Sequence, residues 1–413
     1  MRIGYLMQMG EDIRHPPFNG PANHVRQVVA ELRRQGQPVR VVYGLDEQLW
    51  QTDDLERFVP LRVPALQRGP LRVGERAVRR VQSELRLPYL AFFESLRFAA
   101  ACRRALAGYE VLCERVSWAR YGGVLAARWL EIPLVLEYNG DPLADLEAKQ
   151  IAPRGLQRLL SVALMRATLR GAAHIVATGA GWRRNLVERW GVDAAMVTTV
   201  ENGSELVRLL RREQLRSFQT AVAGPLTLVY LGGFYPWHGL SVLLPALARA
   251  RAQGLDLRLT LIGAGVGLEE TRQRARALGL EERVEFMGHL PTEQYASILA
   301  AADIGLSPYC GWQEFSGLKL FDYKAAGLAI VASGQDGQPA TLRHGVTGWI
   351  VLPCDEEALA AALIRLAQDD DLRRGMGQRA RLEAEAIHGW DHTARQLLTI
   401  FTQAVERYRE DAQ

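Results

Sequence analysis

The sequence predicts an α/β protein with two doubly wound domains, and three observations support this fold class. The chain has 413 residues, more than one hydrophobic core usually holds. Short apolar segments alternate with longer amphipathic segments in both halves, the pattern of parallel strands covered by helices on both faces of a sheet. Glycine-rich turns follow two strand-like segments of the second half, where backbone would come close to a ligand.

The elements of the first half begin with a strand at Ile3–Met7 and a helix at Asn23–Gln35 that ends before Gly36. Further strands are expected at Val39–Tyr43, Leu134–Glu137 and His174–Thr178. The second half repeats the pattern with strands at Leu226–Leu231, Leu257–Ile262, Val284–Met287, Ile304–Ser307, Ala329–Ala332 and Trp349–Val351. The tail has helical spacing, with Leu397, Leu398, Phe401, Val405 and Tyr408 on one face.

These elements divide the chain into an N-terminal Rossmann-like domain at 1–205 and a C-terminal one at 225–388. Residues 206–224 are first charged and then rich in small residues (TAVAG), which predicts a linker. Residues 389–413 are expected to form a separate C-terminal helix. The economical arrangement has the two domains facing each other, with a ligand in the crevice at the carboxyl ends of their strands.

The composition is typical of a folded protein, because 48% of the residues are hydrophobic and 23% are charged. The four cysteines, Cys102, Cys113, Cys310 and Cys354, form no CxxC pair and have no histidines at metal spacing. They predict reduced, mostly buried thiols in a cytosolic protein. Met1 runs straight into a strand and no stretch of about 18 apolar residues occurs, so we expect neither export nor a membrane span.

The net charge of +4 is unevenly spread, with +9 on residues 1–223 and −5 on residues 224–413. Arginines concentrate in 62–104, where Arg76 and Arg80 are interleaved with Val73, Val78 and Val81. Such a segment is compatible with contact to an anionic membrane surface, with an anionic acceptor such as a lipid-linked phosphate, or with a solvated helix face. No basic stripe with interleaved aromatics occurs, which argues against nucleic acid as a partner.

The most informative stretch runs from Trp312 to Ser333 and places Glu314 eight residues before Asp322. Gly317 makes an elbow, and a helix at Leu318–Ala326 follows it. The first N–H groups of a helix lack internal partners and lie at its positive end, so this start suits a phosphate. Asp322, one turn further on, reaches back toward a group such as a ribose hydroxyl. Glu314 is left to meet the next part of a nucleoside diphosphate ligand.

This stretch resembles the signature of the GT-B glycosyltransferases of family 4, in which an acid, seven residues and a second acid precede a small-residue run and an apolar strand. The second acid here is Asp where the family usually has Glu. The resemblance continues, in the family's order, with GPANHV at Gly20–Val25, ENGS at Glu201–Ser204, LGGFYPWHGLSVLL at Leu231–Leu244 and LIGAGVG at Leu261–Gly267. It implies a GT-B fold whose last helix crosses back to the first domain.

The resemblance also implies a function, namely retaining transfer of a hexosyl group from a nucleoside-diphosphate sugar to an acceptor hydroxyl. The acceptor would be a carbohydrate, a lipid-linked molecule or a small metabolite. Neither a metal nor a cofactor is implied, because helix starts and side-chain cations would meet the leaving charge. We expect a cytoplasmic protein, with peripheral contact at the inner membrane face left open. Two alternatives remain, a sugar-nucleotide epimerase and a non-catalytic protein of the same fold that binds sugar nucleotides or glycans.

The expected catalytic residues are Glu314, Lys319 and His238. In the family the segment after Leu231 supplies an Arg and a Lys to the diphosphate, but the matching positions here are Gly233 and His238. We expect His238 to be partly protonated at neutral pH, and a bound diphosphate to favour its cation. Lys319 would supply the missing fixed charge, the alternative being a surface lysine paired with Asp322 or solvent. The expected donor-binding residues are Gly232, Gly233, Gly263, Gly265, Phe315, Ser316, Gly317, Leu318 and Asp322.

In the first domain the resemblance implies contacts to the acceptor or the transferred sugar by Gly20, His24 and Asn139. His24 is equally compatible with a helix start that has no chemistry, and Glu137 with a structural carboxylate. The glycines of LIGAGVG also resemble a dinucleotide fingerprint. A hydride-transfer enzyme would need an acid at the end of the next strand, whereas Glu285 lies within the strand pattern, which disfavours that class.

Overall fold

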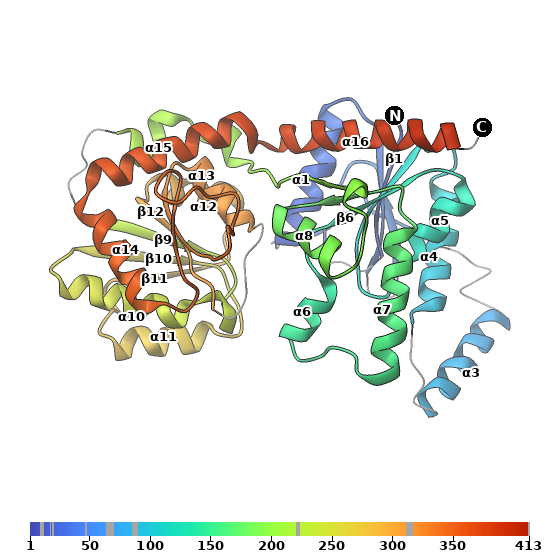
Figure 1. The fold of residues 1–413 in the computed structure, drawn as a ribbon, viewed down its shortest axis with the longest axis horizontal. Coiled ribbons are helices and arrows are strands. Elements are labelled where there is room, and N and C mark those ends of the chain that lie inside the picture. Colours follow the sequence, from blue (N-terminus) through green and yellow to red (C-terminus); the bar gives the residue numbers. More distant parts are fainter. Residues whose placement is uncertain are drawn as a thin grey trace. The chain divides into compact units, whose positions relative to one another are not determined.

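The computed structural model describes residues 1–8, 12–16, 18, 20–45, 48–62, 70–84, 90–219, 224–310 and 317–411. It divides into two compact units, one formed by Met1–Glu201 with Thr393–Gln413 and the other by Asn202–His392 (Figure 1). Each unit is a sheet of mainly parallel strands with helices packed on it. The predicted fold class is therefore confirmed.

Unit 1 contains an eight-stranded sheet in the order β4-β3-β2-β1-β5-β6-β7-β8. Its strands are β1 (Ile3–Met7), β2 (Val39–Leu45), β3 (Gln48–Thr52), β4 (Val59–Pro60), β5 (Val111–Arg115), β6 (Leu134–Tyr138), β7 (His174–Ala177) and β8 (Val197–Thr199). The expectation of a parallel sheet is wrong at one edge, because β3 pairs antiparallel with β2 on one side and with β4 on the other. Only two residues separate β2 from β3, and so short a connection allows no other pairing.

The helices of unit 1 are α1 (Gly20–Arg34), α3 (Pro70–Glu84), α4 (Phe92–Ala105), α5 (Gly122–Leu130), α6 (Pro142–Ala148), α7 (Gly155–Arg170) and α8 (Ala180–Glu188), with a 3₁₀ turn η1 (Ala194–Met196). The C-terminal helix α16 (Trp390–Asp411) belongs to this unit from Thr393 onward. Its apolar face is buried at Leu397 and Phe401, and Thr393 Oγ1 donates to Glu201 O at 3.0 Å. The chain thus returns to its first unit, as the resemblance implied.

Unit 2 contains a six-stranded sheet, parallel throughout, in the order β11-β10-β9-β12-β13-β14. Its strands are β9 (Leu226–Leu231), β10 (Leu257–Ile262), β11 (Val284–Gly288), β12 (Ile304–Ser307), β13 (Ala329–Ser333) and β14 (Trp349–Val351). Its α-helices are α9 (Leu206–Leu209), α10 (Leu240–Ala252), α11 (Leu268–Ala277), α12 (Thr292–Ala300), α13 (Leu318–Ala325), α14 (Glu356–Gln368) and α15 (Asp370–Ile387). The strand order reverses at β9, whose neighbours are β10 and β12. In open α/β sheets such a reversal is where ligands bind, at the carboxyl ends of the strands.

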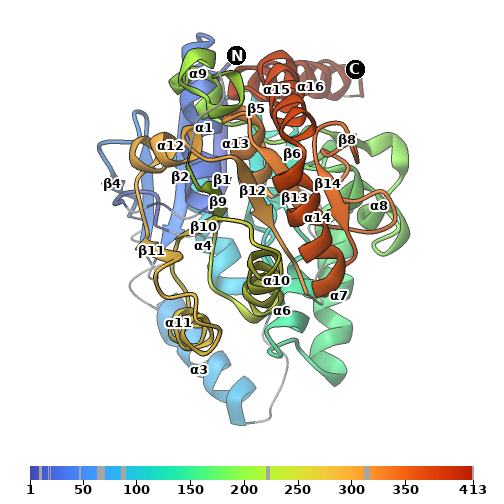
Figure 2. The ribbon, with the colours of Figure 1, turned by 90° about the vertical axis from the view of Figure 1, so that its left-hand side faces the viewer.

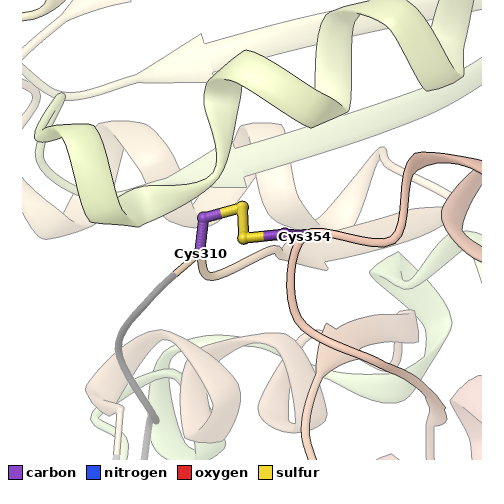
Figure 3. The surroundings of a disulfide bond; sticks show 2 residues. All are labelled: Cys310 and Cys354. Carbon is purple, nitrogen blue, oxygen red and sulfur yellow. A yellow bond between two sulfur atoms is a disulfide. The ribbon is translucent and has the colours of Figure 1, made fainter.

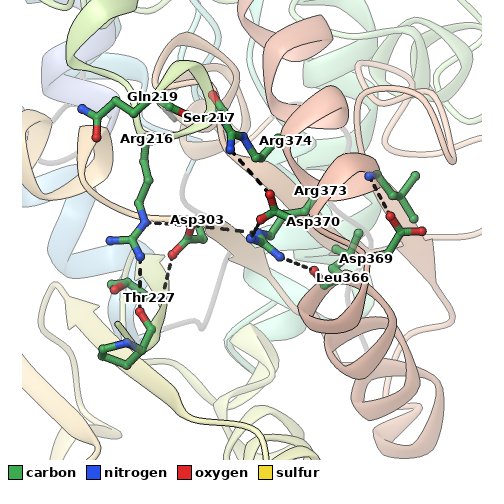
Figure 4. Close-up of polar contacts among 12 residues, drawn as sticks. Arg216, Ser217, Gln219, Thr227, Asp303, Leu366, Asp369, Asp370, Arg373 and Arg374 are labelled. Carbon is green, nitrogen blue, oxygen red and sulfur yellow. Dashed lines mark hydrogen bonds and ion pairs between the residues drawn. The ribbon is translucent and has the colours of Figure 1, made fainter. Parts of the chain in front are cut away.

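The segment expected as a linker is structured where it is described. Besides α9 it forms the 3₁₀ turns η2 (Arg212–Gln214) and η3 (Arg216–Phe218), and a third turn, η4 (Pro236–His238), follows β9. Arg216 Nε donates to Asp303 Oδ1 at 2.9 Å, and Asp303 Oδ2 accepts from Thr227 N at 2.9 Å (Figure 4). An acid just before β12 therefore fastens this segment to the sheet of unit 2, an attachment that the loose composition of 206–224 did not reveal.

Two of the cysteines differ from the expectation of four free thiols. Cys310 and Cys354 form a disulfide (Figure 3), while Cys102 and Cys113 are free and buried. Cys310 lies three residues after β12 and Cys354 three residues after β14, and both strands flank β13. The parallel sheet thus brings together two cysteines that are 44 residues apart in sequence. No helix in the described part of the chain is long and apolar enough to cross a membrane.

Candidate functional site

The start of α13 lies at the carboxyl ends of β9 and β12. Gly317 caps the helix in an extended conformation, and Leu318 is its first residue. Tyr323 fixes the helix to the sheet, because its hydroxyl donates to Leu306 O at 3.1 Å and accepts from Leu231 N at 2.7 Å. Glu314, Phe315 and Ser316 lie outside the described residues, so their assigned roles stay predictions.

Lys319 is buried beside the turn that follows β9. The residue is only 8% exposed. Its Nζ lies over the rings of Tyr230 and Tyr309, at 5.0 and 4.8 Å from their centroids. A Cβ placed on Gly232 would lie 3.2 Å from Nζ, so the absence of a side chain at this position leaves room next to the cation. The alternative of a surface lysine is therefore wrong. The Lys319 charge therefore lies beside the turn after β9, and its contact with a diphosphate stays a prediction.

His238 ends η4 and stabilises the same turn. Its Nδ1 lies 2.6 Å from Gly233 O and 3.1 Å from the Tyr230 hydroxyl, which itself donates to Gly233 O at 2.6 Å. Burial, together with the charge of Lys319, lowers the pKa of His238 to about 4. Our expectation of a partly protonated imidazole is thus wrong. With its single proton on Nδ1 donated to Gly233 O, the neutral ring leaves Nε2 as an acceptor.

The glycine-rich turns after β9 and β10 pack backbone against backbone. Gly263 has φ +135°, and a Cβ on it would lie 1.9 Å from Gly232 O. A Cβ on Gly265 would lie 2.6 Å from Phe234 N, and Phe234 N donates to Ala264 O at 3.0 Å. Both positions require glycine because any side chain would collide with the neighbouring backbone, whether or not a ligand is bound. Their contact with a donor stays a prediction.

Asp322 is partly buried and already has two hydrogen-bond partners. The Ser204 hydroxyl donates to Oδ1 at 2.6 Å, and the Tyr295 hydroxyl donates to Oδ2 at 3.3 Å. Burial raises the pKa of Asp322 to about 7, although the hydrogen bond from Ser204 acts in the opposite direction. Ser204 stands in the ENGS motif but received no role from the sequence, because 118 residues separate it from Asp322. Contact between Asp322 and a ribose stays a prediction.

Lys324, on the same helix, is fully buried and joins α13 to α15. Its Nζ donates to Thr341 O at 2.9 Å and to Glu383 Oε1 at 2.6 Å, and it lies 2.9 Å from His388 Nε2. Burial opposes ionisation of Glu383, but hydrogen bonds from His388 and Lys324 outweigh it and hold the pKa of Glu383 far below its ordinary value. The two lysines of the signature stretch therefore differ in role, since Lys324 anchors the helix that presents Lys319.

In unit 1 a buried network joins β1, α1 and β6. Glu137 Oε2 accepts from the Tyr5 hydroxyl at 2.5 Å, and Oε1 lies 2.9 Å from His24 Nε2. Asn139 Nδ2 donates to the same carboxylate at 3.4 Å. Burial favours protonation of Glu137, but His24 and the hydrogen bond from Tyr5 outweigh it and lower the pKa to about 2. The structure thus brings His24 and Asn139 together around one ionised carboxylate, whereas Gly20 only begins α1.

A second buried acid near this network was missed by sequence reasoning. Glu114, in β5, accepts from Gln8 Nε2 at 2.6 Å, and burial raises the pKa of Glu114 to about 7. A Cβ on Gly123 would overlap the Glu114 carboxylate, so the first turn of α5 packs directly on this acid. Among the residues that the structure describes, no three His, Cys, Asp or Glu side chains gather as a metal ion would require.

Comparison with known proteins gives two family matches. A glycosyl transferase 4-like domain matches residues 19–203, and glycosyl transferases group 1 matches residues 225–369. The phosphatidyl-myo-inositol mannosyltransferase of Mycolicibacterium smegmatis is 32% identical over 217 residues, which are 50% of this chain and 52% of that protein. The D-inositol 3-phosphate glycosyltransferase of Nocardia farcinica is 29% identical over 317 residues, 73% of this chain and 68% of that protein. The chain spans about half the length of the first of these relatives.

Solved structures share the fold along nearly the whole chain. The HepE protein of Anabaena, in complex with UDP, has a TM-score of 0.68 at 17% identity and covers 98% of this chain and 100% of its own. The sucrose-phosphate synthase of Thermosynechococcus elongatus has a TM-score of 0.68 at 21% identity and covers 97% and 98%. Two glycosyltransferase families thus match, one in the first half of the chain and one in the second. The solved structures share the two-unit fold. The chain therefore belongs to the group 1, family 4-like glycosyltransferases of GT-B fold.

Proposed function

We propose that the protein transfers a sugar from a nucleoside-diphosphate sugar to an acceptor hydroxyl with retention at the anomeric carbon. The observation that carries the proposal is Lys319, a buried cation held by two tyrosine rings at the start of α13 and beside the glycine turn after β9. A buried positive charge beside unobstructed backbone is suited to an anion such as a diphosphate.

In the proposed reaction the bond between the anomeric carbon and the diphosphate oxygen breaks, and its electron pair stays on the diphosphate. The acceptor oxygen attacks the same face of the sugar, and its proton passes to the departing phosphate. Lys319 and the first N–H groups of α13 stabilise the charge that grows on the diphosphate. These groups would make a metal ion unnecessary. Activity that survives chelation of divalent cations is the expected result.

Asp322 would accept hydrogen bonds from the ribose. Ser204 and Tyr295 hold its carboxylate at present, so a ribose hydroxyl would join or replace one of them. Because the pKa of Asp322 is about 7, the carboxylate is only partly ionised at neutral pH. Donor binding would then favour the ionised form.

The acceptor side of the reaction would use the network around Glu137. An ionised, buried carboxylate flanked by the Asn139 amide is suited to orienting sugar or acceptor hydroxyls. The relatives are named for phosphatidyl-myo-inositol and D-inositol 3-phosphate, so both molecules are the first acceptors to test. UDP, GDP and ADP sugars all remain candidates as donor.

The test begins with thermal unfolding in UDP, GDP and ADP, where a ligand at about 100 times its dissociation constant adds about 2.7 kcal/mol. Sugars of the stabilising nucleotide are then incubated with and without acceptor. NMR of the product should show the donor's anomeric configuration. Conversion of the donor to an epimer without an acceptor, or binding without turnover, would contradict the proposal and favour the two alternatives.

A further inference from the structure

The helix α3 turns two charged residues, Glu75 and Arg79, toward the protein and its valines toward solvent. Glu75 is 7% exposed and pairs with Arg79 at 2.8 Å and with Arg97 of α4, while Arg79 also pairs with Glu94 of α4. In contrast, three valines of the same helix are largely exposed, with 58% for Val73, 45% for Val78 and 50% for Val81. A surface helix normally buries its apolar stripe, so this orientation is reversed.

The outward side also carries cations. Arg76 and Arg80 are exposed among the valines, and we call this set, Val73, Arg76, Ala77, Val78, Arg80 and Val81, the α3 face. Arg80 Nε donates to the exposed Glu84 at 2.9 Å, and an ion pair so open to solvent is weak enough to yield to a lipid phosphate. A helix that lies in the interface of a lipid bilayer places its apolar side chains at the acyl boundary and keeps arginines on its polar side, and Arg76 and Arg80 border the exposed valines in this way. Arginines in such a position are attracted to anionic head groups. The face lies in the half of the chain that carries a charge of +9.

A second apolar surface lies at the same end of unit 1. Leu156, Leu159 and Leu160, at the start of α7, are 56%, 66% and 37% exposed, and we call them the α7 tip. The exposed Arg154 precedes them. Both views place α3 and the start of α7 at one end of this unit (Figures 1 and 2). Two separate apolar projections at one end suit an extended surface better than a partner that fills a single groove.

We propose that unit 1 docks on an anionic lipid bilayer through the α3 face and the α7 tip. The valines and leucines enter the head-group region, and Arg76 and Arg80 contact lipid phosphates. The exposure of the valines favours a membrane surface over a solvated helix face, because a solvated face would bury its valines against the protein. The inference does not depend on the proposed transfer reaction. The inference places the protein at a lipid surface. An acceptor carried by a lipid would be present at the same surface.

The test measures co-sedimentation of the full chain with vesicles of phosphatidylcholine alone and with vesicles that also contain about one third phosphatidylglycerol. We expect binding to the anionic vesicles only, weakened by salt. In the double variant R76Q/R80Q the partition coefficient should fall about 25-fold, since each arginine contributes about fivefold. The triple variant V73S/V78S/V81S should lose at least about tenfold. Serine and valine have similar helix propensities, so α3 should persist.

The matched control is R274Q/R276Q, which removes two exposed arginines from α11 in unit 2 and should bind vesicles like the wild type. Circular dichroism and thermal unfolding are measured for each variant, to check that it is folded. Equal binding to both vesicle types would overturn the assignment, as would unchanged binding by the α3 variants. A dimer in light scattering that the valine substitutions dissociate, without vesicle binding by the wild type, would show that a second copy covers the α3 face instead.

Discussion

Replacing Lys319 with methionine separates its role in charge stabilisation from its role in packing. Methionine keeps a long, unbranched side chain between Tyr230 and Tyr309 and removes the charge together with the hydrogen bond of 3.4 Å from Nζ to the Tyr309 hydroxyl. Loss of one preorganised group that faces a developing negative charge costs about 3 kcal/mol, or about 10²–10³ in turnover. The structure also limits the effect on stability. Two cation–π contacts of about 1–2 kcal/mol each disappear, but so does the desolvation of a buried ammonium, which is of similar or larger size.

The assay combines initial rates, urea unfolding and an NMR titration of His238. We expect turnover to fall about 100-fold or more while the free energy of unfolding changes by less than about 2 kcal/mol. Because Lys319 contributes to the low pKa of His238, that pKa should rise from about 4 in the variant, although burial keeps it below its ordinary value. The control is K149M, which removes an exposed lysine paired with Asp145 at 2.8 Å and should leave turnover unchanged. A raised pKa of His238 with turnover within about threefold of the wild type would refute the role of Lys319.

Three further predictions follow from the remaining site residues. Donor affinity, measured by calorimetry, should increase as pH rises through about 7 because Asp322 ionises there, and D322N should flatten this profile; a flat wild-type profile would exclude Asp322 from the binding equilibrium. G263A should lose about 2–5 kcal/mol of unfolding free energy, since its Cβ meets Gly232 O. The control G279A has open space around its Cβ and should lose only about 1–2 kcal/mol. Equal losses in urea unfolding would contradict the packing argument. H24Q should destabilise the protein by about 3 kcal/mol at neutral pH, because the buried Glu137 loses its ion-pair partner while the hydrogen bonds from Tyr5 and Asn139 remain. The depressed pKa of Glu137 stabilises the wild type above pH 4.5 and loses this effect as the pH falls toward 2, so the variant should show a weaker acid dependence.

Most of the fold follows from local pattern. The strands of unit 2 were predicted to within one residue at each end, because buried parallel strands bounded by glycine or by helix starts give a strong signal. The antiparallel edge of unit 1 was missed, since Gln48–Thr52 is partly exposed and its polar residues do not form an apolar run. The segment 206–219 was taken for a linker because its attachment depends on Asp303, 87 residues beyond Arg216.

The site could be predicted only in part. The structure has Lys319 and Asp322 on one helix, as their spacing predicted, while their contacts with a donor stay predictions. Partners brought together by the sheet remained hidden, as with Ser204 and Asp322 or with His24 and Glu137, which are 113 residues apart. The protonation state of His238 was also wrong, because it depends on burial and on Lys319, neither of which a single sequence specifies.

The most direct test of the account is a crystal structure of the protein with a bound nucleoside diphosphate. We predict the β-phosphate within about 3 Å of Lys319 Nζ, beside Gly232 and the first turn of α13, with the ribose on Asp322. A diphosphate bound away from Lys319 and α13 would contradict the central claim.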